Sequence, residues 1–375
     1  LRRQRQMCIR DRAYIPPTIA GVVLAYRKKY LLGGIVTALF IALQIQSNHI
    51  QMSYYFMFVI LFFVGAYFED AYKKKELPHF FKASGVLALA AVVGVCINIS
   101  NLYHTYEYSK ETMRGKSELK QEGAAASQTS SGLDRDYITN WSYGIGETLT
   151  LLVPNVKGGG SGSTMSQSEA AMAKANPMYN GIYSQLPQYF GEQPWTAGPV
   201  YVGAFVMFLF VLGCFIVKGP LKWALLGATI FSILLSWGKN FMGLTDFFID
   251  YVPMYNKFRA VSSILVIAEF TIPLLAIFAL KEILSKPDML KQEKNCRGVI
   301  AALVLTAGVA LILAVAPGTF FSSFITTQEM TALKQALPAE HLAPFVANLT
   351  EMREAIIASD AWRSFFIIVI GCLFL

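Results

Sequence analysis

The chain has 375 residues, of which 54% are hydrophobic and only 15% are charged, and its mean hydropathy is +0.45. A soluble domain carries about 25% charged residues, so the composition excludes an ordinary soluble domain and indicates an integral membrane protein. The net charge of +8 does not indicate nucleic-acid binding. The basic residues concentrate in short loops between apolar runs, and no motif for binding nucleic acid occurs.

Cysteine and histidine give no sign of a metal site or a disulfide framework. The five cysteines lie far apart without a CxxC pair, and the four histidines lack ligand spacing. The sequence also contains no P-loop, nucleophile elbow or HExxH motif. We therefore expect no metal ion and no cofactor.

Both ends of the chain look artificial. Residues 1–12, LRRQRQMCIRDR, resemble translated sequencing-adapter read-through, and they lack the apolar region and cleavage site of a signal peptide. The chain stops at Leu375 inside the apolar run FFIIVIGCLFL. We expect residues 1–12 to be a sequencing artefact and the chain to be an internal fragment of a longer membrane protein.

The order of apolar runs predicts an all-α polytopic membrane protein with about eight to nine transmembrane helices. Residues 13–99 are expected to form helices 1–4 and residues 197–316 helices 5–8, while residues 362–375 begin a truncated ninth helix. The individual runs cover residues 13–26, 30–46, 52–68, 82–99, 197–217, 221–237, 260–280, 298–316 and 362–375.

Lysine and arginine cluster in alternate loops. The loops after the first, third, fifth and seventh runs are basic, as in Arg27–Lys29 and Lys73–Lys75, whereas the loops between them carry few cations. The positive-inside rule places the basic loops in the cytoplasm. Residues 100–196 are then an extracytoplasmic loop region, and residues 317–361 an extracytoplasmic amphipathic segment broken at Pro338 and Pro344.

The extracytoplasmic region has a patterned composition. Residues 123–132 and 157–164 are rich in Gly, Ser and Ala and are predicted to be flexible. The stretch LDRDYITNWSYGIGETLTLLVPN (133–155) lies between them. Residues 176–203, dense in Tyr, Pro and Gly, are typical of an irregular, aromatic-lined surface near lipid headgroups.

Three acidic residues of this stretch, Asp134, Asp136 and Glu147, are candidate catalytic groups. In a sugar transfer a carboxylate can accept the proton of the attacking hydroxyl or orient the sugar. The alternative is that they are solvated loop acids. Glu147 precedes the apolar run LTLLVP, so it is expected at the membrane edge, where an unpaired charge is costly. It therefore needs a partner or a function.

Cations and aromatic rings suggest ligand contacts. Tyr255, Lys257 and Arg259 lie on the predicted outer side, where they could bind a lipid phosphate or could anchor a helix end by snorkelling. Trp141 and Tyr143 could stack on a sugar ring or belong to an interfacial aromatic belt.

Four segments carry a resemblance to a known family. TYEYSKETMRGKSEL, GLDRDYITNWSYGIGETLTLLVPN, FGEQPWTAGPVYVG and FFIDYVPMYNKFRAVSSILVIAEF resemble the YfhO family of large bacterial membrane proteins, over roughly residues 14–284. That family is similar to polytopic glycosyltransferases of the GT-C type. Such enzymes take a sugar from a polyprenyl-phosphate carrier on the outer face of the bacterial inner (cytoplasmic) membrane, and YfhO-type proteins are linked to glycosylation of cell-envelope polymers.

The resemblance implies partners and site residues. The partners would be a polyprenyl-phosphate sugar, a cell-envelope polymer acceptor and the lipid bilayer, with no nucleic acid. Glu147, Asp134 and Asp136 would lie near the sugar-transfer site, and Tyr255, Lys257 and Arg259 near the carrier phosphate. GT-C enzymes usually carry their key acid in the first outer loop, upstream of this fragment. We therefore expect the fragment to be inactive alone.

Two other functions stay open. A transporter or flippase for a lipid-linked saccharide would need a polar path through the membrane, and Glu269 is a rare acid inside an apolar run. An internal inverted repeat in the complete protein would favour this function. A non-catalytic scaffold for envelope assembly would use the outer loop as a binding surface.

Overall fold

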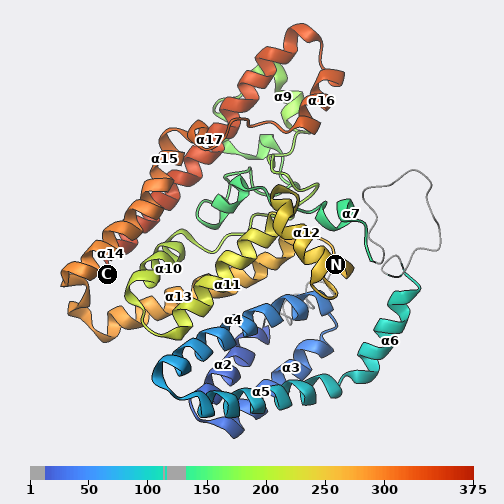
Figure 1. Cartoon of the computed structure of the whole chain (residues 1–375). Coiled ribbons are helices and arrows are strands. Elements are labelled where there is room, and N and C mark those ends of the chain that lie inside the picture. The colour runs from blue at the N-terminus through green and yellow to red at the C-terminus, as the bar shows by residue number, and fades with distance from the viewer. Residues whose placement is uncertain (1–12, 113–114, 116–131) are drawn as a thin grey trace. The chain divides into compact units, whose positions relative to one another are not determined.

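The computed structural model describes residues 13–112, 115 and 132–375 (Figure 1). All regular structure in these residues is helical, and the one isolated β-bridge pairs Thr164 with Pro187. The predicted all-α class is confirmed for this part of the chain. Residues 1–12 and nearly all of the predicted flexible segment 123–132 lie outside the described residues.

Each predicted apolar run overlaps a helix, although the boundaries shift. The bounds are α2 (Ile15–Tyr26), α3 (Tyr30–Gln46), α4 (Ile50–Lys74), α5 (Leu77–Cys96), α6 (Ile99–Lys110), α7 (Arg135–Thr139), α8 (Glu169–Met172), α9 (Asn180–Tyr183), α10 (Ala204–Ile216), α11 (Pro220–Ser236), α12 (Met242–Tyr251), α13 (Val266–Ser285), α14 (Glu293–Leu303), α15 (Val309–Val315), α16 (Thr327–Ala336) and α17 (Ala339–Leu373).

Five of the described helical segments are long and apolar enough to cross a membrane. They are Ile50–Lys74, Leu77–Cys96, Val261–Ser285, Glu293–Val315 and Ala339–Leu373. A sixth candidate is the pair Pro220–Ser236 and Gly238–Tyr251, which is bent by 107°. The protein is therefore a multi-pass membrane protein by helix length and composition. The apolar helices α2, α3 and α10 have only 12, 17 and 13 residues, against the roughly 20 that a perpendicular span needs.

The chain divides into two compact units, which we describe separately. The first comprises Leu1–Thr139, Lys218–Ser232 and Gly243–Ala260. The second comprises Asn140–Val217, Ile233–Met242 and Val261–Leu375.

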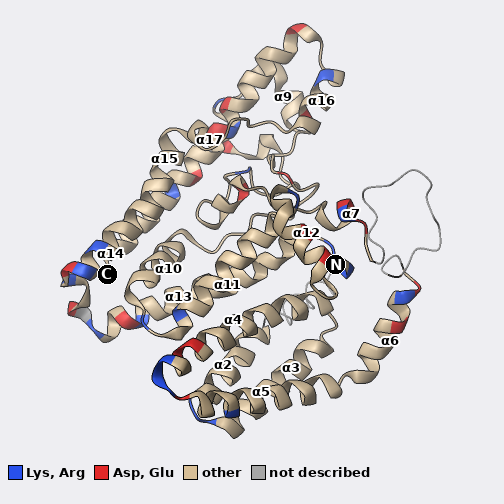
Figure 2. Ribbon diagram, in the orientation of Figure 1, with Lys and Arg blue, Asp and Glu red and all other residues tan. Residues whose placement is uncertain are grey.

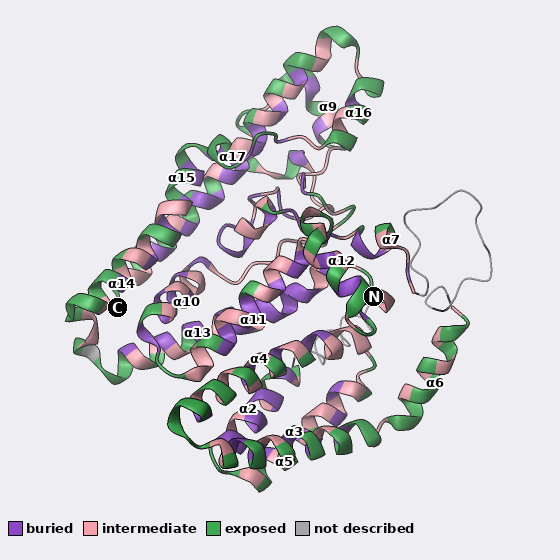
Figure 3. Ribbon diagram, in the orientation of Figure 1, coloured by how far each residue is buried: buried purple, intermediate pink, exposed green. Residues whose placement is uncertain are grey.

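In the first unit, α2, α3 and α5 pack on one another and α4 packs on α5 (Figure 1). Gly21 and Gly33 let the backbones of α2 and α3 approach closely, because a Cβ at either position would overlap the other helix. Small residues serve this purpose in membrane helix pairs. By contrast, α6 buries none of its residues and is mostly exposed along its length (Figure 3).

The two ends of α4 meet different loops of the first unit. At one end, Gln51 Nε2 donates to the carbonyl of Arg259 (2.7 Å), and the Tyr54 hydroxyl donates to the carbonyl of Pro253 (2.9 Å). At the other end, basic and acidic residues gather in the turn between α4 and α5 (Figure 2). The 25 residues of α4 separate these ends by roughly 37 Å. Within the first unit, residues 253–259, which are predicted to lie outside, thus meet one end of α4, and the α4–α5 turn, which is predicted to be cytoplasmic, lies at the other end.

In the second unit, α10 packs against α13, α14 and α17, and α15 packs against α17 (Figure 1). A short π-helix (Val304–Gly308) joins α14 to α15, so these elements form one continuous apolar helix. The N-terminal half of α17 covers a separate apolar cluster, which includes Met165, Tyr183, Phe345 and Leu349.

The segment 317–361 differs from its prediction. Pro338 does break the chain, because it is the N-cap of α17. Pro344 lies inside α17, which continues without interruption to Leu373. Proline is tolerated here because it removes only one backbone hydrogen bond close to the helix start, and Phe345 and Leu349 just beyond it pack into the apolar cluster. The part of the amphipathic segment from Ala339 onward and the ninth apolar run therefore form one helix, while α16 precedes it as a separate helix.

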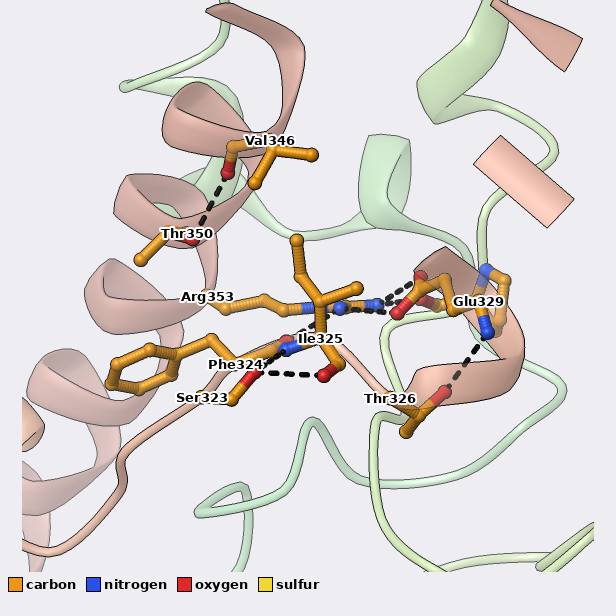
Figure 4. Close-up of polar contacts among 9 residues, drawn as sticks. Ser323, Phe324, Ile325, Thr326, Glu329, Val346, Thr350 and Arg353 are labelled. Carbon is orange, nitrogen blue, oxygen red and sulfur yellow. Dashed lines mark hydrogen bonds and ion pairs between the residues drawn. The ribbon is translucent and has the colours of Figure 1, made fainter. Parts of the chain in front are cut away.

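A buried ion pair fastens α16 to α17. Arg353 is fully buried and donates from Nη1 and Nη2 to the two carboxylate oxygens of Glu329, at 2.7 Å each (Figure 4). Nη1 also donates to the carbonyl of Phe324 (2.6 Å), and the guanidinium lies over the ring of Phe190 (4.9 Å). This forked geometry uses the planar donor set of arginine.

We expect Arg353→Ala to lower the free energy of unfolding by about 3–5 kcal/mol, because it leaves the Glu329 carboxylate buried without its counter-ion. The matched control is Arg297→Ala, since that side chain is 77% exposed and pairs with the exposed Glu293. Thermal unfolding in detergent measures both variants. Equal shifts for the two variants would contradict a structural role for the Arg353–Glu329 pair.

Candidate functional site

Within the first unit, residues 133–137, which include Asp134 and Asp136, contact residues 255–259, which include Lys257 and Arg259. The backbone N–H of Leu133 donates to the carbonyl of Asn256 (3.0 Å). The side chain of Asp134 accepts a hydrogen bond from the backbone N–H of Asp136 (2.8 Å). This contact lies at the start of the short helix α7. Asp134 is half-buried and committed to this turn, whereas Asp136 is exposed.

Arginine and tyrosine side chains make the second connection. Arg259 Nη1 donates to the Tyr137 hydroxyl at 2.6 Å, and the guanidinium carbon lies 5.5 Å from the centre of the Tyr137 ring. Arg259 is exposed, and Tyr137 directly follows Asp136. The side chains of Tyr137 and Arg259 are thus in contact, and Asp136 and Lys257 are their near neighbours along the chain. We define these four residues, Asp136, Tyr137, Lys257 and Arg259, as the surface cluster.

A salt bridge holds α7 against α12 within the same unit. Arg135 donates to the carboxylates of Asp246 and Asp250, the latter at 2.6 Å. The two aspartates lie four residues apart and so share one face of α12. These ion pairs hold α7, which carries Asp136 and Tyr137, against α12.

The three predicted phosphate-binding residues have different surroundings. Tyr255 is 2% exposed, and its hydroxyl has no hydrogen-bond partner among the described residues. Lys257 is half-buried, and burial lowers the pKa of its ammonium group. Lys257 and Arg259 can face a ligand, while Tyr255 packs edge-on against Phe248.

In the second unit, Glu147 is 1% exposed and its carboxylate accepts three hydrogen bonds. The donors are the backbone N–H of Gly144 (3.0 Å), the hydroxyl of Tyr189 (2.5 Å) and the backbone N–H of Glu192 (2.8 Å). We call this group the Glu147 clamp. It joins the 3₁₀-helix Gly146–Leu151 to residues 189–192, which are distant in sequence.

Two glycines permit this approach of separate chain segments. A Cβ at Gly191 would overlap Oε1 of Glu147, so only glycine fits beside the carboxylate. Gly158 has φ +81° and a Cβ there would overlap the Gln188 carbonyl. The segment 157–164 was predicted to be flexible, and this prediction is wrong. Its backbone pairs with residues 186–196, for example from Gln188 N–H to the Ser163 carbonyl (2.8 Å).

A lysine lies close to the Glu147 clamp. The Lys157 ammonium is placed over the rings of Phe321 (4.2 Å) and Phe190 (4.9 Å). Burial lowers its pKa, although the charges of Glu147 and Glu192 act in the opposite direction. Glu147, Lys157 and Tyr189 line a cavity of about 10 Å³, the size that one water molecule occupies.

The predicted sugar-contacting aromatics are held by hydrogen bonds. Trp141 donates from Nε1 to the carbonyl of Trp195 (3.1 Å) and is half-buried. Tyr143 is 3% exposed, shares a hydrogen bond of 2.5 Å with the Thr150 hydroxyl, and has a pKa that burial raises. Trp195, whose carbonyl accepts the hydrogen bond of Trp141, is itself 58% exposed.

The predicted site residues therefore fall into two sets. Asp134, Asp136, Tyr255, Lys257 and Arg259 belong to the first unit, and Trp141, Tyr143 and Glu147 to the second. The described residues contain no group of three or more His, Cys, Asp or Glu that could hold a metal ion. Sequence reasoning missed Tyr137, Lys157 and Gly191; the FGEQ motif around Gly191 was the available signal for the last of these.

We expect Glu147→Gln to lower the free energy of unfolding by about 1–3 kcal/mol, because an amide NH₂ must then face one of the three donors. The measurement is thermal or denaturant unfolding of the purified protein. Glu351→Gln is the matched control, since Glu351 is exposed. An unchanged stability for Glu147→Gln would contradict the clamp.

Lys157 should make stability depend on pH in the alkaline range. Its lowered pKa means that the folded state binds this proton less tightly than the unfolded state. Burial of the charged ammonium therefore lowers the free energy of unfolding. This loss of stability is complete below the lowered pKa, and it disappears as the pH rises toward the ordinary pKa of 10.5. Wild-type Tm should therefore improve relative to that of Lys157→Met between pH 7 and pH 10. The exposed Lys174→Met is the control, and a difference that declines with pH would contradict the assignment.

Comparisons of the chain with protein-family models, with curated proteins and with solved structures found no match.

Proposed function

We propose that this protein is a membrane glycosyltransferase that transfers a sugar from a polyprenyl-phosphate carrier to a cell-envelope acceptor on the outer face of the membrane. The observation that carries the proposal is the Arg259–Tyr137 contact. This contact joins residues 133–139 to residues 255–259 in the surface cluster. The cluster lies at the Gln51 end of α4, which is predicted to face outside. The resemblance to the YfhO family and its GT-C-like fold supports the same function.

The cations of the surface cluster are suited to the carrier phosphate. Arginine presents a planar fork of donors that matches phosphate oxygens, and lysine adds a point charge. Arg259 is exposed and Lys257 is half-buried, so both can face a headgroup. In this proposal Tyr255 packs inside the unit and does not touch the ligand.

Asp136 is the acid–base candidate of the cluster. The acceptor hydroxyl oxygen attacks the anomeric carbon of the sugar, and the bond from this carbon to the carrier phosphate oxygen breaks. The proton of the hydroxyl passes to the Asp136 carboxylate, and polyprenyl phosphate leaves with the bonding electron pair. Arg259 and Lys257 stabilise the negative charge that develops on the phosphate.

Glu147 takes no direct part in the transfer in this proposal. Its carboxylate is buried and accepts three hydrogen bonds, which leaves it out of reach of a substrate hydroxyl. Asp134 positions α7 through its hydrogen bond to the Asp136 backbone.

A transporter of lipid-linked saccharides is the second candidate. The bent pair α11–α12, with its 107° angle, is the observation that favours it, because interrupted membrane helices form the substrate sites of many transporters. Transport would move the saccharide across the membrane without cleaving it from the carrier. The two functions are therefore distinguished by the fate of the sugar–phosphate bond.

The test is an assay of labelled sugar transfer from a panel of polyprenyl-phosphate sugars, in membranes that contain the protein. Asp136→Asn should lower kcat by about a hundredfold, because it removes the base. Arg259→Ala should raise the KM for the donor by roughly tenfold or more, because it removes a charged hydrogen bond to the phosphate.

Lys239→Ala is the control for a cation outside the cluster, since its exposed side chain forms a long ion pair of 3.9 Å with Glu192. It should retain wild-type kinetics. A wild-type protein that transfers no sugar from any donor would reject the glycosyltransferase, and movement of intact carrier in its place would support the transporter. Full activity of Asp136→Asn would reject Asp136 as the base.

A further inference from the structure

A cavity of about 490 Å³ opens in the first unit at the end opposite to the surface cluster. Ligand pockets in proteins measure ~300–1,000 Å³. The lining comes from the C-terminal ends of α2 and α4, the first turns of α5 and α11, and the loops between them. Three of the loops that charge distribution assigns to the cytoplasm therefore meet at one pocket.

The pocket carries an excess of positive charge. Its lining contains the cations Arg27, Lys28, Lys74 and Lys218 and the acids Asp70 and Glu76, which leaves a net charge of two positive. Lys74 pairs with Asp70 (2.7 Å) and Lys28 with Glu76 (3.4 Å). Neither Arg27 nor Lys218 forms an ion pair with the described residues, and both are exposed.

The floor of the pocket is aromatic and rigid. The ring of Tyr26 stacks on Tyr67 (4.4 Å between centroids) and on Phe80 (5.6 Å). The Tyr26 hydroxyl shares a hydrogen bond with Ser84 (3.0 Å), and His79 donates from Nε2 to the Tyr26 carbonyl (2.8 Å). A ligand would therefore meet a preformed site with cations at its rim.

We propose that this pocket binds the phosphate of an anionic phospholipid headgroup from the cytoplasmic leaflet. Arg27 and Lys218 would contact the phosphate, because their charges are not neutralised by Asp70 or Glu76. Basic pockets at the cytoplasmic ends of membrane helices recognise anionic headgroups through the same electrostatic attraction. This proposal does not rest on the proposed glycosyltransferase.

Exposed apolar side chains beside the pocket favour a lipid over a soluble phosphate. Phe68 is 44% exposed, Tyr72 67% and Phe81 63%. The rings of Phe68 and Phe81 both contact Phe80 in the pocket lining (5.4 and 5.5 Å). A headgroup in the pocket could thus extend its acyl chains along the exposed faces of α4 and α5.

The test is native mass spectrometry of the detergent-solubilised protein, titrated separately with phosphatidylglycerol, phosphatidylcholine and inorganic phosphate. The wild-type protein should retain phosphatidylglycerol with an affinity at least tenfold above that for the zwitterionic lipid. Arg27→Gln combined with Lys218→Gln should weaken phosphatidylglycerol binding by about tenfold or more. Both side chains are exposed, and circular dichroism checks that the variant remains folded.

Lys29→Gln combined with Lys75→Gln is the matched control, because it removes the same charge from the loop of Arg27 and from the neighbouring α4–α5 turn, at positions outside the pocket lining. It should bind like wild type. An equal loss in both double variants would overturn the site, since general loop charge would then explain the binding. Displacement of the lipid by inorganic phosphate at equal concentration would overturn the lipid as the source of the phosphate.

Discussion

A buried carboxylate in an apolar protein has to be satisfied, and the second unit is arranged around that requirement. Glu147 has no salt bridge within the described residues and takes three hydrogen-bond donors from Gly144, Tyr189 and Glu192. Those contacts join segments more than 40 residues apart, and Gly191 provides the space beside the carboxylate. An unsatisfied carboxylate at this position would cost more than any of these hydrogen bonds contributes. The loop region is therefore ordered by polar contacts, although the chain is largely apolar.

Hydrophobic runs predicted the helices well because burial in lipid and helix length are both readable from composition. Loop charge also predicted which loops share an end of the first unit, since Arg27, Lys74 and Lys218 line one pocket while Gln51 meets Arg259. The prediction failed for glycine, which occurs both in flexible linkers and where two backbone segments pack closely. The glycines of 157–164 looked like a flexible linker, but they allow close backbone approach, which composition does not reveal.

The candidate site was only partly predictable for the same reason. Glu147 was expected to need a partner or a function at the membrane edge, and its partners come from 189–192, a long-range pairing that a single sequence cannot supply. Tyr255, Lys257 and Arg259 lie within five residues, yet the 3₁₀ turn at Tyr255–Lys257 buries Tyr255 and leaves Arg259 exposed. The Tyr137–Arg259 contact joins residues 122 positions apart and had no local signal.

The central claim is that residues 133–139 and 255–259 form a binding surface for a polyprenyl-phosphate sugar. The most direct measurement is photo-crosslinking of a diazirine-bearing polyprenyl-phosphate sugar to the protein in membranes, followed by peptide mapping. The account predicts that the label falls on peptides that contain Tyr137 and Arg259, and that unlabelled carrier competes for it. Labelling confined to other peptides, or labelling that excess carrier does not reduce, would contradict the account.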